Sequence, residues 1–110
     1  MVIQFKKGLL EYCILSLLRG SDRYGYDIAQ TLGERIEIAD GTVYPILRRL
    51  CAENCLTSYI REGGGGPPRK YYAMTPAGRD LLASLSAEWN TLVKQVAYLT
   101  ETEEGETQHD

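Results

Sequence analysis

Apolar residues recur at helical spacing in three successive segments of the first half of the chain. Residues 4–19 carry a broad apolar face, and Gly20 is expected to end this helix. A second helix is predicted over residues 24–32, with Gly33 at its end. The third segment, residues 43–50, has the single stripe of an amphipathic helix. The predicted core positions are Leu9, Leu10, Cys13, Ile14, Leu17, Leu18, Tyr26, Ile28, Ala29, Leu32, Val43, Ile46, Leu47 and Leu50.

The third helix carries residues suited to each of its ends and a distinctive outer face. Asp40 can cap the first turn, Pro45 fits that turn, and Asn54 tolerates the left-handed conformation that follows a helix. The face opposite the apolar stripe holds hydroxyl, phenol and guanidinium groups without a carboxylate. Such a face suits a groove of phosphates and base edges, although arginines on exposed helices are usually only solvated. Its residues are Thr42, Tyr44, Pro45, Arg48 and Arg49.

After the third helix the pattern becomes that of β-strands. Residues 56–61 and 69–75 are rich in strand-forming residues, and residues 62–68 between them contain four glycines and two prolines. This predicts a hairpin with a long tip. Earlier in the chain, residues 21–23 between the first two helices are expected to form a turn. A phosphate-binding P-loop is disfavoured because no Gly-Lys-Ser/Thr and helix follow the glycines. Basic residues flank the tip and favour contact with a phosphate backbone: Arg61, Arg69 and Lys70.

A long last helix is expected to begin at Thr75 as N-cap and Pro76 as first residue. Its apolar residues are spaced 3, 4, 3, 4, 3 and form a narrow heptad seam. The narrow seam favours a partner helix, and hence a dimer, over packing within one chain. The seam consists of Leu82, Leu85, Trp89, Leu92, Val96 and Leu99. Residues 101–110 are acidic and are expected to form a disordered tail.

The net charge of −3 is unevenly distributed along the chain. Residues 1–76 contain ten Lys and Arg against eight Asp and Glu, whereas residues 77–110 contain two against seven. The acidic total therefore does not exclude nucleic-acid binding, because the local field matters more at a groove.

The length of 110 residues fits one domain, and the chain has neither a run of 18 apolar residues nor a signal-peptide pattern. A cytoplasmic protein without membrane contact is therefore expected. Three cysteines argue against a disulfide framework. Cys51 and Cys55 could bind a metal, but the one histidine is His109, so buried free thiols are favoured and no metal or cofactor is predicted. No nucleophile–base pair is evident, which disfavours an enzyme.

Four motifs narrow the prediction further: Leu10 to Leu18, Tyr24-Gly25-Tyr26-Asp27-Ile28, Gly41-Thr42-Val43-Tyr44-Pro45-Ile46-Leu47-Arg48-Arg49-Leu50, and Arg69-Lys70-Tyr71-Tyr72 followed by Thr75-Pro76-Ala77-Gly78. Together they resemble the PadR family of transcriptional regulators, in its short form with a single C-terminal helix. The resemblance covers residues 5–99. One departure is Asn54-Cys55, where the family usually has a glycine before the strand of the hairpin.

The resemblance implies a mainly α fold with a small β-hairpin, divided into a winged helix-turn-helix domain (1–75), a dimerisation helix (76–100) and the acidic tail (101–110). It also implies a homodimer bound to a pseudo-palindromic operator in double-stranded DNA, usually as a repressor. By analogy, the DNA contacts are Tyr24, Thr42, Tyr44, Arg48, Arg69 and Lys70. An alternative is a winged-helix module that binds proteins and does not read DNA.

Some members of the family bind planar aromatic effectors between the C-terminal helices and the first helices. By analogy, such an effector would contact Phe5, Gly8, Tyr12 and Trp89. The competing interpretation is that Trp89 serves only as the core of the dimer interface, since large aromatic residues commonly anchor such contacts.

Overall fold

The structure, a computed structural model, describes the backbone of residues 2–39 and 41–109 and the side chains of residues 8–39 and 41–101. Its three strands form one antiparallel sheet in the order β1-β3-β2. The chain is mostly helical with a small sheet, as the sequence predicts for a winged helix-turn-helix. The elements in chain order are α1 (Val2–Leu17), β1 (Arg23–Tyr24), α2 (Gly25–Arg35), α3 (Val43–Ala52), β2 (Leu56–Arg61), β3 (Arg69–Met74) and α4 (Pro76–His109).

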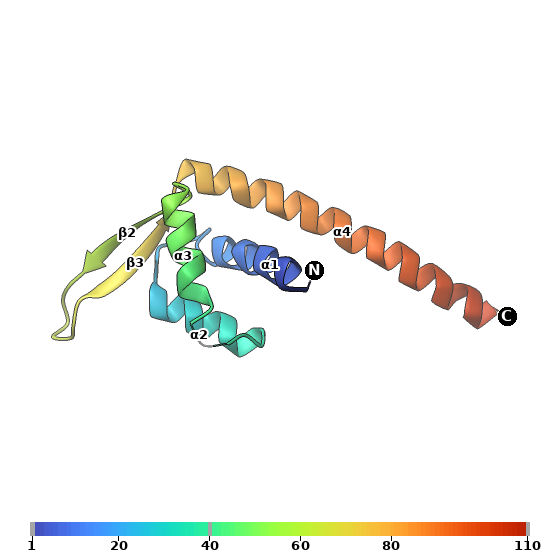
Figure 1. The fold of residues 1–110 in the computed structure, drawn as a ribbon, viewed down its shortest axis with the longest axis horizontal. Helices are drawn as coiled ribbons and strands as arrows, with labels where there is room; N and C mark the ends of the chain where they lie inside the picture. The colour runs from blue at the N-terminus through green and yellow to red at the C-terminus, as the bar shows by residue number, and fades with distance from the viewer. Residues whose placement is uncertain (1, 40, 110) are drawn as a thin grey trace.

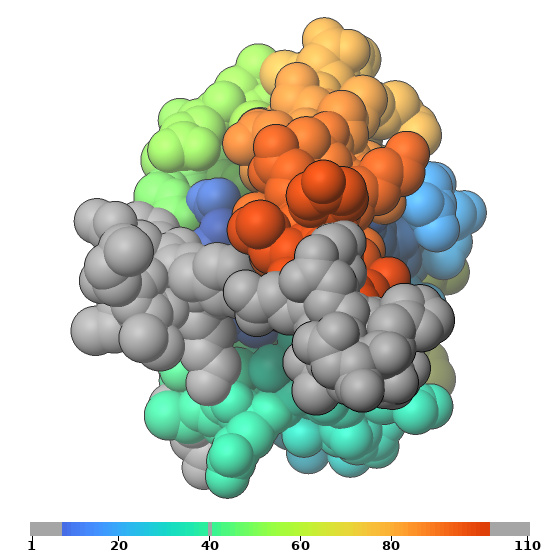
Figure 2. Space-filling model, turned by 90° about the vertical axis from the view of Figure 1, so that its right-hand side faces the viewer, coloured from blue at the N-terminus to red at the C-terminus, as the bar shows by residue number. Residues whose placement is uncertain are grey.

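The molecule is elongated, with extents of 66 × 27 × 25 Å. Figure 1 shows α4 along the upper edge with α1 beneath it, and α3 standing between α1 and the hairpin of β2 and β3. The hairpin and the C-terminal end of α4 lie at opposite ends of the long axis. Seen from the C-terminal end in Figure 2, α4 forms the upper part of the surface and the end of α2 forms the lower part.

The hydrophobic core lies where α1, α2 and α3 meet the inner face of the sheet and the start of α4. The stripe predicted for the third helix is buried throughout, at Val43, Ile46, Leu47 and Leu50. Leu15, which the helical pattern did not single out, is fully buried as well. The remaining buried apolar residues are Leu10, Ile14, Leu18, Ile28, Leu32, Cys55, Leu56, Tyr72 and Leu82.

Two expectations for α2 are wrong. The helix does not end at Gly33 but continues to Arg35, and the N–H of Ile36 donates to the carbonyl of Leu32. A glycine weakens a helix interior by only about 1 kcal/mol, which packing of Ile28 and Leu32 in the core can offset. Tyr26, expected in the core, is 56% exposed.

Residues 21–23 contain more than the predicted turn. Arg23 and Tyr24 form β1 and pair with Tyr72 and Tyr71 of β3. A strand of two residues has no periodicity to detect, and it exists here because the neighbouring strand supplies its hydrogen-bonding partners. The sheet therefore extends beyond the predicted hairpin to the start of α2.

The end of α3 and the start of α4 follow the predicted backbone chemistry. Asn54 has φ 63°, the left-handed conformation expected after a helix. The hydroxyl of Thr75 accepts a hydrogen bond from the N–H of Gly78 at 3.0 Å, so Thr75 is the N-cap of α4. Asp40, the predicted N-cap of α3, lies outside the described residues, and Thr42 occupies the N-cap position without a side-chain capping bond.

The backbone of α4 remains helical to His109, so the tail expected from residue 101 is not separated from the helix. Adding residues to an existing helix costs little, and the glutamates of this segment have favourable helix propensity. The composition of residues 101–110 does not show that a preceding helix can extend into them.

Candidate nucleic-acid interface

Four of the predicted DNA-contacting side chains line one shallow depression. They come from β1, from α3 and from β3. The depression has a volume of about 310 Å³, and none of the described residues that line it carries a carboxylate. The four side chains are Tyr24, Tyr44, Arg48 and Lys70. The surface therefore combines two phenols with two cations, which suits an anionic partner.

Close packing at Gly25 brings the start of α2 to this depression. Gly25 is buried, and a Cβ placed on it would lie 2.9 Å from Cε1 of Tyr72 and 3.7 Å from Cε1 of Tyr44. A side chain at this position would force the buried Tyr72 ring or α2 to shift, whereas the distance to Tyr44 is an ordinary van der Waals contact. Glycine is thus required by space at this contact.

Tyr72 forms the floor beneath Lys70. The Lys70 Nζ lies 5.7 Å from the centroid of the Tyr72 ring, within cation–π range. Burial raises the pKa of the Tyr72 hydroxyl, and Arg48 partly opposes that shift. The Tyr72 phenol is consequently harder to deprotonate than an exposed tyrosine.

The opposite face of the sheet carries a second group of aromatic and basic side chains. Tyr24, in the edge strand β1, lies at the border and belongs to both groups. Tyr71 stacks between Tyr24 and Tyr59, with ring centroids 6.0 and 5.8 Å away. Arg61 lies over Tyr71 and Arg69 lies over Tyr24, at 4.9 and 5.1 Å from the ring centroids. Tyr59 and Tyr71 were not among the predicted site residues, although their alternating positions in paired strands could have indicated a shared face.

Asp22 holds one end of this tyrosine row. The Tyr59 hydroxyl donates a hydrogen bond of 2.7 Å to Oδ2 of Asp22. This bond raises the pKa of Tyr59, because the carboxylate stabilises the protonated phenol. The contact ties β2 to the segment preceding β1.

The predicted basic residues of the hairpin do not converge on one site. Successive side chains of a strand point to opposite faces. Arg69 and Arg61 are directly opposite each other in the register and share the outer face, whereas Lys70 points toward α3. The hairpin therefore presents cations on both of its sides.

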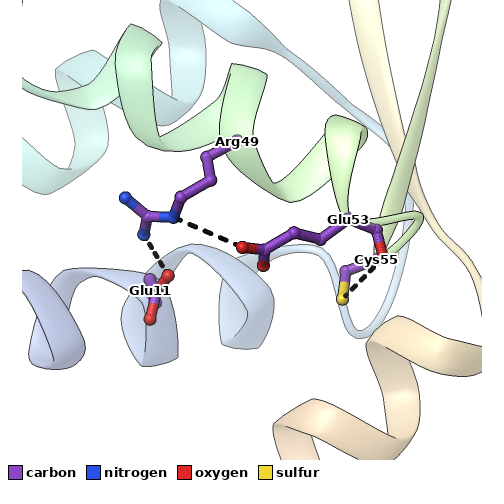
Figure 3. Close-up of polar contacts among 4 residues, drawn as sticks. All are labelled: Glu11, Arg49, Glu53 and Cys55. Atoms are coloured by element: carbon purple, nitrogen blue, oxygen red, sulfur yellow. Dashed lines mark hydrogen bonds and ion pairs between the residues drawn. The ribbon is translucent and has the colours of Figure 1, made fainter.

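Arg49 is a correction to the predicted DNA face. Its guanidinium pairs with Glu11 of α1, and its Nε lies 3.9 Å from Oε2 of Glu53 (Figure 3). The side chain is therefore directed along the contact between α3 and α1 and does not join Arg48. Thr42 and Pro45 remain on the outer side of α3, where Pro45 is exposed and Thr42 half-buried.

A separate groove lies between α1 and α4 and holds three of the predicted effector-contacting residues. Gly8, Tyr12 and Trp89 line it, and its volume is about 530 Å³. The rings of Tyr12 and Trp89 are 6.4 Å apart between centroids. The side chain of Phe5 lies outside the described residues. The groove and the depression formed by α3 and β3 share no lining residue.

The predicted seam of α4 divides into two parts. Leu82 is 8% exposed and belongs to the core of its own chain, so its assignment to a dimer interface is not supported, and Leu85 packs against the same core. Leu92, Val96 and Leu99 are exposed, with Leu99 at 64%. The residues available to a partner helix are thus those of the later part of the seam.

In the described part of the chain, no three His, Cys, Asp or Glu side chains gather closely enough to hold a metal ion. The three cysteines are free thiols. None of the helices in the described ranges is both long and apolar enough to cross a membrane.

The chain is similar in sequence and in fold to several solved structures. A PadR family transcriptional regulator from Eggerthella lenta is 38% identical, with a TM-score of 0.75 over 93% of this chain and 90% of that chain. A PadR-like transcription factor from Bacteroides fragilis is 42% identical, with a TM-score of 0.73 over 87% and 94%. Bacillus subtilis PadR, whose structure is a complex with operator DNA, is 31% identical, with a TM-score of 0.61 over 69% of this chain and 44% of that chain.

The family model of the transcriptional regulator PadR-like family matches residues 14–84. The match includes α2, α3 and the sheet, which together form the depression and the tyrosine row. Because this match spans more than half of the chain, the chain belongs to the PadR-like family of transcriptional regulators.

Proposed function

We propose that this chain binds a pseudo-palindromic operator in double-stranded DNA as a homodimer and acts as a repressor. The observation that carries the proposal is the carboxylate-free depression where Tyr24, Tyr44, Arg48 and Lys70 meet. α3 enters the major groove, where Arg48 can donate two hydrogen bonds to guanine or phosphate. Lys70 and the arginines of the hairpin contact the flanking backbone. The relative from Bacillus subtilis, whose structure is a complex with operator DNA, supports DNA binding as such.

The exposed part of α4 supports the homodimer. Leu92, Val96 and Leu99 form an apolar strip on a helix that extends away from the core. A two-fold axis through paired α4 helices relates two copies of α3, and each copy reads one half of a palindromic site. Repression then follows if the operator overlaps the site at which polymerase binds.

The groove between α1 and α4 supports the proposal that a small effector binds there and releases the DNA. Its volume of about 530 Å³ suits a small molecule, and Tyr12 and Trp89 offer aromatic surfaces to a planar ring. We expect planar cationic or phenolic compounds to quench Trp89 fluorescence and to lower DNA affinity. Unchanged fluorescence at high compound concentration would leave Trp89 as interface core only.

Fluorescence anisotropy with labelled promoter DNA tests DNA binding directly. The affinity should fall on the order of 10³-fold or more between 50 and 200 mM salt, because several phosphate contacts release counterions. Arg48→Ala should weaken binding by about 1–3 kcal/mol, and Lys70→Ala should reduce the salt dependence by about one counterion. If both variants bind like the wild type, the assigned DNA surface is wrong.

Arg79→Ala is the charge-matched control for these variants. Arg79 is exposed on α4 and does not line the depression, so its removal should leave the affinity unchanged. A random duplex of equal length measures the non-specific component. Failure of the wild-type protein to bind either duplex at low salt would favour the alternative, a winged-helix module that binds proteins.

A further inference from the structure

The inward direction of Arg49 creates a direct link between two helices. Among the described side chains, one ion pair joins different helices, and it is formed by Arg49 of α3 and Glu11 of α1. The two side chains are 30% and 20% exposed, so water screens the pair only in part. Figure 3 shows the guanidinium between Glu11 and Glu53, above the α1 helix.

Each member of this ion pair adjoins a residue of a different functional surface. Tyr12 follows the glutamate along α1 and lines the groove beside Trp89. The Tyr12 hydroxyl also lies 3.4 Å from Oγ of Ser86 on α4. Arg48 precedes the arginine along α3 and lines the DNA-facing depression. Neither member of the ion pair lines the groove or the depression, but each is next in sequence to a residue that does.

We propose that Arg49 is a positioning residue that couples the α1–α4 groove to the DNA-facing side of α3 through Glu11. This inference rests on the proposed DNA binding and adds the route of its regulation. A molecule that enters between Tyr12 and Trp89 displaces α1, and the ion pair passes that displacement to α3. Coupling between two sites is reciprocal, so DNA bound by α3 alters the surroundings of Trp89 without any effector.

The chain contains one tryptophan, so intrinsic tryptophan fluorescence reports on the groove alone. We expect Trp89 emission of the wild-type protein to change in proportion to the fraction bound as promoter DNA is added. Glu11→Gln preserves side-chain size and removes the charge that holds Arg49. This variant should bind DNA roughly 2- to 30-fold more weakly and should lose most of the Trp89 response at saturation.

Glu53→Gln is the matched control, since it removes the other carboxylate near Arg49 and leaves the link between α3 and α1 in place. Its Trp89 response should equal that of the wild type. Arg49→Lys keeps the charge but loses the fork of N–H donors, so a partial response is expected. This milder variant also provides the test if Glu11→Gln does not fold.

Two results would overturn the coupling. One is a Trp89 response at DNA saturation that is the same in Glu11→Gln and the wild type, with only the melting temperature lowered, because a merely structural ion pair would behave in this way. The other is unchanged Trp89 emission in wild-type protein that anisotropy shows to be saturated with DNA. Absence of DNA binding by the wild type would instead refute the proposed function itself.

Discussion

Two glycines show how differently one residue type is used in this chain. Gly78 lies in the first turns of α4, and a Cβ on it would lie 2.1 Å from the carbonyl oxygen of Cys55 and 2.8 Å from Cγ of Met74. Gly33 lies inside α2, and a Cβ there would meet nothing within 4 Å. Only Gly78 is required by a close approach, since it lets α4 begin against the turn that follows α3.

Alanine substitutions at these glycines should therefore have opposite effects on stability. Gly78→Ala is expected to lower the free energy of unfolding by at least about 2 kcal/mol, because backbone atoms must move to admit the methyl group. Gly33→Ala should raise it by about 0.5–1 kcal/mol, since alanine has the better helix propensity. Urea titration followed by circular dichroism measures both, and a destabilised Gly33→Ala would contradict the open space around Gly33.

The three thiols should react slowly in the folded protein. Burial raises the pKa of Cys13, Cys51 and Cys55, and nearby Glu53 and Glu11 raise that of Cys55 further. At pH 8 the folded chain thus holds less of the reactive thiolate than the unfolded chain. We expect iodoacetamide labelling, followed by mass spectrometry, to be markedly slower in native buffer than in urea.

The raised pKa values of the three thiols also predict how the free energy of unfolding changes with pH. A thiol whose pKa is higher in the folded state contributes stability below the pKa of the unfolded thiol. That contribution is lost as the pH rises from the unfolded pKa through the folded pKa, because the unfolded chain releases its thiol protons first. The midpoint of urea unfolding should accordingly fall in mildly alkaline buffer, and a variant with all three cysteines replaced by alanine should lose this component.

At the scale of elements, the joint between α3, β2 and α4 depends on Thr75. Its hydroxyl accepts from the N–H of Gly78 and donates to the carbonyl of Asn54 at 2.7 Å. Thr75→Ala should lower the stability by about 1 kcal/mol, the usual loss of an N-cap, and Thr75→Ser should restore most of it. Equal melting temperatures for the alanine variant and the wild type would show that the cap contributes nothing.

Local patterns were sufficient to predict the elements whose signals lie within their own residues. The stripe of α3, the two strands of the hairpin and the start of α4 at Thr75 all follow from spacing and capping chemistry. β1 could not be found in this way, because its two residues become a strand only through pairing with β3. The end of α2 was misplaced at Gly33 because packing of Leu32 offset a weak local signal.

The candidate DNA surface was predictable only in part, because local patterns indicate contacts within one element and not between elements. Tyr44 and Arg48 share a face of one helix, so their proximity follows from helical periodicity. The direction of Arg49 depends on Glu11, which lies 38 positions away in the sequence, and periodicity carries no information about that partner. The division of the hairpin cations between two faces likewise required knowledge of the register.

At the scale of the whole molecule, α4 should determine the state of association. The later part of its seam is exposed, whereas Leu82 is already used by the core. Replacing Val96 and Leu99 by glutamate should convert a dimer into a monomer without unfolding the core, because buried carboxylates at a helix–helix seam are costly. Analytical ultracentrifugation measures the mass, and Lys94→Glu, off the seam, is the control.

A dimeric wild-type protein that remains dimeric after both seam substitutions would show that the contact lies elsewhere. A monomeric wild-type protein would remove the basis for a palindromic site. In either case, circular dichroism should confirm that α4 is still helical, so that loss of association is not confused with loss of the helix.

The inward direction of Arg49 also limits the number of side chains on α3 that can form hydrogen bonds with base edges in the proposed complex. In the proposed binding mode, α3 offers DNA one guanidinium, that of Arg48, together with the hydroxyl groups of Thr42 and Tyr44. If the proposed dimer reads two half-sites, we expect the spacing between them to contribute strongly to discrimination among promoters. We expect inserting about five base pairs, half a helical repeat, at the operator centre to abolish binding, whereas a typical single mismatch costs about 1–3 kcal/mol.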